Sequence, residues 1–120
     1  MASLPPGLRR KLIDLGPRDP FEVALLIPDT RRALKWFSQN QYAVLGGDVW
    51  VKADGDQYRP ALDNWSIDAK RDEPWTAYVQ RARTLAGREL ARIERDYQNY
   101  SVAIVPVVAT ETEYEALNIH

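Results

Sequence analysis

Cysteine is absent from the 120-residue sequence, and histidine occurs only once, as the last residue, His120. Without cysteine the chain forms no disulfide, has no thiolate nucleophile and offers no cysteine ligand for zinc. With one histidine at the chain end, a serine or cysteine nucleophile has no internal imidazole to activate it. The missing cysteines also fit a reducing compartment.

The sequence lacks an apolar run of about 20 residues, which a membrane-spanning helix needs, and its first residues do not form a signal peptide. We therefore expect a cytoplasmic protein. The length and the ordinary apolar fraction of 45% predict a single domain over residues 1–120. Within it, we expect residues 1–19 to be an N-terminal extension with a short helix and residues 110–120 to be an acidic C-terminal tail.

Neither sign of charge dominates, because the net charge is −1 and the isoelectric point is about 5.8. This balance argues against a protein that wraps nucleic acid, whose affinity depends on neutralising phosphates. Residues 1–40 carry seven Lys or Arg and four Asp or Glu. Residues 41–80 carry the reverse, four Lys or Arg and seven Asp or Glu. The acidic middle third favours a basic partner.

Local patterns predict three helices. Leu8, Leu12 and Leu15 indicate a short helix that ends at Gly16. Pro28-Asp29-Thr30 predicts the start of a second helix, capped by Asp or Thr, that ends near residues 38–40. Apolar residues at three- and four-residue spacing predict a long helix over about residues 73–97. Residues 110–120 form either a loose tail or a short terminal helix.

Strand patterns separate these helices. Residues 42–52 and 100–109 predict two strands, and the Gly46-Gly47 pair in the first predicts a bulge, a bend or a close backbone approach. Residues 53–56 predict a hairpin turn, followed by a return strand over residues 57–59 that ends at Pro60. Residues 64–67 are expected to be extended, Pro106 to lie at an edge or bulge, and residues 22–27 to be strand or turn.

The predicted fold class follows from the order of these elements. It is α+β, with a mostly antiparallel sheet of three to four strands packed against one long helix and one or two shorter helices.

Four carboxylates and two tryptophans stand out in the acidic middle third. Asp48, Asp54, Asp56 and Asp63 fall within sixteen residues, a density that also suits acid–base chemistry or a divalent cation. Turn chemistry alone explains Asp54-Gly55-Asp56, however. Trp50 and Trp65 are of a residue type enriched among interface hot spots.

Three segments give the chain a family resemblance: Ala33-Leu34 on a helix, the strand Val44-Leu45-Gly46-Gly47-Asp48-Val49-Trp50, and Asp63-Asn64-Trp65. Over about residues 20–108 the sequence resembles the immunity protein 40 family of bacterial polymorphic toxin systems. The resemblance implies an α+β protein without enzymatic activity that binds and neutralises a cognate toxin through the toxin's C-terminal domain. It transfers no mapped contact residues, and the Gly-Gly-Asp and Asn-Trp motifs have a structural interpretation as well.

The resulting hypothesis is a protein–protein interaction without cofactor, metal, nucleic acid or membrane. Its candidate partner-binding residues lie around the hairpin and combine acidic side chains with tryptophans: Asp48, Trp50, Asp54, Asp56, Asp63 and Trp65. Two alternatives stay open, a small carboxylate-dependent enzyme with a divalent metal and a general protein-interaction adaptor.

Overall fold

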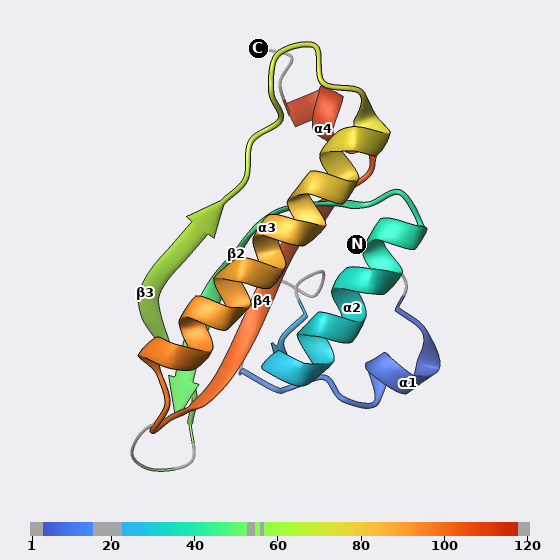
Figure 1. Cartoon of the computed structure of the whole chain (residues 1–120). Helices are drawn as coiled ribbons and strands as arrows, with labels where there is room; N and C mark the ends of the chain where they lie inside the picture. The colour runs from blue at the N-terminus through green and yellow to red at the C-terminus, as the bar shows by residue number, and fades with distance from the viewer. Residues whose placement is uncertain (1–3, 16–22, 53–54, 56, 118–120) are drawn as a thin grey trace.

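The computed structural model describes residues 4–15, 23–52, 55 and 57–117, and Figure 1 shows its course. Along the chain, helices and strands follow in the order α1 (Pro6–Arg9), β1 (Leu25–Leu26), α2 (Ile27–Gln39), β2 (Ala43–Lys52), β3 (Arg59–Ser66), α3 (Trp75–Asp96), β4 (Ser101–Ala109) and α4 (Glu111–Leu117).

The four strands form one antiparallel sheet with the order β1-β4-β2-β3. The apolar strand β4 therefore lies inside the sheet, between β1 and β2, while β3 forms an edge. Helices α2 and α3 cover the same face of this sheet (Figure 1). The predicted α+β class with a mostly antiparallel sheet is confirmed.

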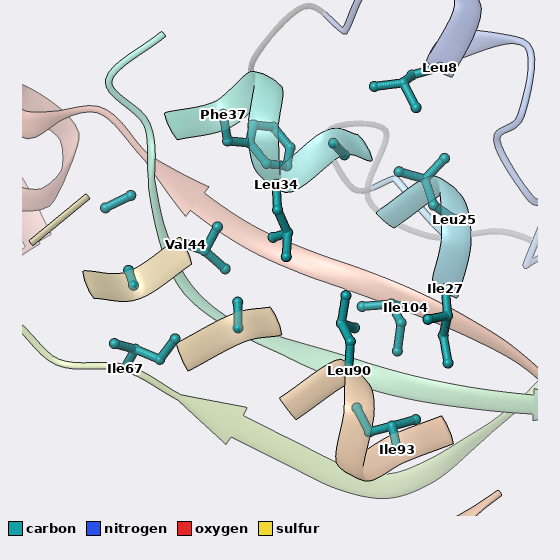
Figure 2. Close-up of a cluster of buried hydrophobic side chains, with 14 of the residues drawn as sticks. Leu8, Leu25, Ile27, Leu34, Phe37, Val44, Ile67, Leu90, Ile93 and Ile104 are labelled. Carbon is teal, nitrogen blue, oxygen red and sulfur yellow. The ribbon is translucent and has the colours of Figure 1, made fainter. Parts of the chain in front are cut away.

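The main core fills the space between the two long helices and the sheet. Figure 2 shows side chains of α2 and α3 meeting those of β1, β2 and β4 there. Phe37 of α2 and Leu90 and Ile93 of α3 are fully buried, as is Ile104 of β4. The three- and four-residue spacing predicted for α3 thus supplies one continuous apolar face. The phenolic O–H of Tyr78, also buried, donates to the carbonyl of Ile67 at 2.6 Å.

Two helix predictions need correction. The first helix ends at Arg9 and does not reach Leu15, because the chain turns and the Ile13 N–H donates to the Ala24 carbonyl at 2.8 Å. The second helix begins at Ile27, with Pro28 in its first turn and no side-chain cap. Instead of capping, the Thr30 hydroxyl donates back to the Leu26 carbonyl at 2.9 Å.

The strand after the hairpin is longer than predicted. The expected strand end at Pro60 is wrong, since β3 continues from Arg59 to Ser66. Proline is tolerated because β3 is an edge strand, where a missing N–H breaks no ladder bond. Pro106 lies at a local edge as predicted, because within the described part of the chain β1 pairs only with Ala103 and Ile104. The undecided segment before α2 includes strand β1, and the terminal segment includes helix α4.

Candidate partner-binding surfaces

The sheet face opposite α2 and α3 carries Asp48 and Trp50. In the strand register, Asp48 lies between Asn64 of β3 and Val105 of β4, and Trp50 lies opposite Ala103. Because directly paired residues point to the same face, these side chains share one surface. Trp50 is half-buried and packs with Tyr58 against a small cluster of Ala24, Ala103 and Val105.

A part of this face is covered by the chain before β1. Ile13 and Leu15 pack against the same small cluster and so cover the half of this face that β1 and β4 form. On the side towards β3, Asn64 and Ser66 are exposed and Val107 is 46% exposed. We call the surface made of Asp48, Trp50, Asn64, Ser66 and Val107 the open face.

The end of the open face near the hairpin is held by polar and aromatic contacts. The Lys52 ammonium lies 5.1 Å from the centroid of the Tyr58 ring, a cation–π distance. The Tyr58 hydroxyl is 2.7 Å from the Ser101 hydroxyl across the sheet. These contacts hold the side chains together at the hairpin end of the open face.

Asp63 points to the other side of the sheet, where Arg92 of α3 binds it. Nη1 and Nη2 of Arg92 donate to the two carboxylate oxygens at 3.0 Å each, and the Tyr97 hydroxyl donates at 2.9 Å. Arg92 also binds Glu89 at 2.8 Å and Asp96 at 3.2 Å. The Arg92 hydrogen bonds, followed by that of Tyr97, hold the pKa of Asp63 below its ordinary value despite partial burial. We call Asp63, Arg92 and Tyr97 the clamp.

The indole of Trp65 lies against the Gly-Gly pair of β2. A Cβ on Gly47 would stand 2.6 Å from the Trp65 ring, and one on Gly46 would overlap the Trp65 carbonyl. β2 also has one extra residue opposite β4 between Val44 and Gly46. Both the bulge and the close approach predicted for the glycine pair are thus confirmed. The indole N–H is buried with no acceptor among the described groups.

The six residues predicted to bind a partner therefore do not share one surface. Asp48 and Trp50 lie on the open face, whereas Asp63 and Trp65 lie on the side of the helices. Asp54 and Asp56 lie outside the described residues. A catalytic carboxylate pair of Asp48 and Asp63 is not formed, because the sheet separates them.

Sequence reasoning missed Leu62, the most exposed large apolar side chain in the described part of the chain. Its exposed fraction is 89% and its φ is +57°, in the left-handed region. The adjacent apolar residues Ala61 and Leu62 break the two-residue alternation of a regular strand, and this was the available signal. Sequence reasoning also missed the pairing of Arg92 with Asp63, which lies 29 residues away in the sequence.

Among the described residues, no three His, Cys, Asp or Glu side chains gather as a metal site would require. An open hollow of about 370 Å³ lies between the start of α2 and the end of α3 and is lined by Leu26, Ile27, Pro28, Glu94, Tyr97, Gln98, Tyr100 and Val102. No helix in the described ranges is long and apolar enough to cross a membrane.

Comparison with known proteins gives a family match. No curated protein and no solved structure matches the chain. The family model described as Immunity protein 40 matches residues 11–108, which is most of the sequence and includes β1 to β3, α2, α3 and nearly all of β4. The chain therefore belongs to the Immunity protein 40 family.

Proposed function

We propose that this chain protects the cell that makes it by binding and neutralising a protein toxin, and that it does so without catalysis. The membership of the Immunity protein 40 family carries this proposal. The partner is the C-terminal toxin domain of a protein encoded beside this chain. We propose that the two meet in the cytoplasm, which suits a chain without cysteine.

We further propose that the open face is part of the contact surface. It combines a half-buried indole, a carboxylate and exposed small side chains on a rigid sheet, whereas both long helices pack on the opposite face. Interfaces of this kind draw most of their affinity from a few aromatic or apolar side chains surrounded by polar ones. A carboxylate such as Asp48 speeds the encounter with a basic toxin.

The test begins with protection. Expression of the toxin domain encoded beside this chain should stop growth, and co-expression of the chain should restore it. Calorimetry with a catalytically inactivated toxin domain should then give a one-to-one complex. A chain that neither restores growth nor binds this domain overturns the proposal.

Charged substitutions then test the surface. Asn64→Arg and Val107→Lys change exposed side chains on the open face and should weaken binding at least about tenfold. The matched control is Gln80→Arg, which changes an exposed residue of α3 on the helix side and should leave affinity unchanged. Equal affinities for all three variants would place the contact surface elsewhere.

A further inference from the structure

Strand β3 carries a protrusion at its middle. Asn64 pairs with Asp48 and Pro60 pairs with Trp50, so residues 61–63 of β3 stand opposite Val49 alone. Such extra residues bend a strand and re-aim a side chain. In this protrusion the redirected side chain is that of Leu62, which is 89% exposed.

The backbone of Leu62 is strained. Three described non-glycine residues have a positive φ, and Gln41 and Asp72 are the other two. Those two are polar and lie in turns next to α2 and α3, where left-handed residues are common. Leu62 is the one that lies within a strand. A left-handed leucine brings its Cβ too close to the following carbonyl oxygen, so this conformation persists only when the surroundings enforce it.

Both neighbours of Leu62 supply that enforcement. Ala61 packs against the main core. Asp63 is held by the other two residues of the clamp. The Arg92 guanidinium donates two hydrogen bonds of 3.0 Å to it, and the Tyr97 hydroxyl donates one of 2.9 Å. The protrusion is therefore fixed on both sides, while the side chain between them gains almost no burial from the chain itself. A strained backbone that holds an apolar side chain in solvent does not serve the fold itself and points to contact with another molecule.

We infer that Leu62 is an anchor residue that inserts into an apolar pocket on the toxin domain. This inference rests on the proposed function and names a residue at the edge of the sheet that bounds the open face. A preformed protrusion loses little entropy on binding, which favours affinity. Leu62 is 89% exposed in the free chain, so its insertion into a pocket removes nearly a whole leucine side chain from water, which favours association.

The charges beside Leu62 indicate the sign of the charge expected around that pocket on the toxin domain. Asp63, Glu89 and Asp96 all pair with the single guanidinium of Arg92, so this ion-pair group carries two net negative charges. A basic rim on the toxin pocket is complementary to it. The exposed Arg59, also on β3, opposes this attraction.

The main experiment compares two substitutions of Leu62 in the full chain, with the inactivated toxin domain as the probe. Leu62→Asn removes the apolar side chain and keeps a residue type that tolerates a positive φ. It should raise the dissociation constant at least about tenfold and leave the melting temperature equal or higher. Leu62→Met keeps an aliphatic side chain of similar volume and should bind within about threefold of the wild-type protein.

Charge variants test the rim. Asp96→Asn removes one exposed carboxylate and leaves the contacts of Asp63 intact, so association at low salt should slow down and at high salt should not change. Arg59→Gln should have the opposite effect on the association rate. Unchanged rates for both variants would overturn the basic rim.

The outcomes separate this inference from the proposed function. Wild-type binding together with unchanged binding of Leu62→Asn would overturn the anchor role alone. Absence of wild-type binding would overturn the proposed function. If sedimentation shows that the wild-type chain dimerises and Leu62→Asn is a monomer that still binds toxin normally, the partner of Leu62 is a second copy and the inference is wrong.

Discussion

Arg92 of α3 holds Asp63 of β3 through two parallel hydrogen bonds of 3.0 Å, and this pair joins the long helix to the edge strand. The two residues are 29 positions apart in the sequence, and the side chain of Arg92 is about one-third exposed and that of Asp63 about one-fifth. Bidentate pairs of this type combine charge with fixed geometry. Partial solvent exposure screens the attraction, so its contribution stays well below that of a buried pair.

The first prediction concerns this pair. Asp63→Asn keeps the side-chain volume but removes the charge and one of the two acceptor oxygens that Arg92 and Tyr97 share. We expect the free energy of unfolding to fall by about 1–2 kcal/mol in urea denaturation at neutral pH. Asp96→Asn, which changes the most exposed carboxylate bound to Arg92, should cost less than about 0.5 kcal/mol. Equal costs for the two variants would contradict a special role for Asp63.

The second prediction concerns acid stability and Glu73. Arg81 donates to both oxygens of Glu73, at 2.7 and 2.8 Å, and the Lys70 N–H donates at 3.0 Å. The hydrogen bonds from Arg81, followed by that from Lys70, lower the pKa of Glu73 from 4.5 to about 2. Because the pKa is lower in the folded state, the ionised carboxylate stabilises the fold fully above about pH 4.5. This contribution is lost as the pH falls towards 2.

Glu73→Gln tests this linkage. The variant should be less stable than the wild-type protein at pH 7, and the difference should shrink steadily between pH 4.5 and pH 2. Arg81→Gln removes the donor and should show the same convergence with the wild-type protein. Denaturation at several pH values measures the effect, and curves that stay parallel over this range would contradict it.

The third prediction tests the close approach between β2 and β3. Gly47→Ala puts a methyl group 2.6 Å from the Trp65 ring, so either the indole or the strand must move. We expect a loss of about 1–3 kcal/mol in the free energy of unfolding and a change in tryptophan fluorescence. Gly87 is the matched control, because an added Cβ on this residue of α3 meets nothing within 4 Å. Gly87→Ala should stabilise the protein by about 0.5–1 kcal/mol.

The regular parts of this fold were predictable because they follow from periodicity. α3 and β4 differ from the predicted ranges by one or two residues, since one has a single apolar face and the other is almost continuously apolar. The Gly46-Gly47 pair predicted a bulge or close approach, although not that Trp65 is the group that approaches. These features depend on local sequence, which local reasoning can use.

The candidate surfaces were less predictable because they depend on pairing between distant segments. Asp48 and Asp63 look equivalent in sequence, but the register of β2 and β3 places them on opposite sides of the sheet. A shift of one residue would exchange the faces, and no local signal fixes that register. The irregular stretch at Leu62 has a similar origin, because the break in alternation at Ala61 and Leu62 does not by itself show that three residues stand opposite Val49.

The fourth prediction isolates the strain at Leu62 from any partner. Because the side chain is 89% exposed, substitutions there remove almost no packing and report mainly on the backbone. Leu62→Asn should raise the free energy of unfolding by about 0.5–1 kcal/mol, since asparagine tolerates the left-handed region. Leu62→Val should lower it by a similar amount, because a β-branched side chain at a φ of +57° is more strained than leucine. Urea denaturation of the two variants and the wild-type protein measures both changes. If the Leu62→Asn variant proves less stable than the Leu62→Val variant, the backbone at this position holds no left-handed strain.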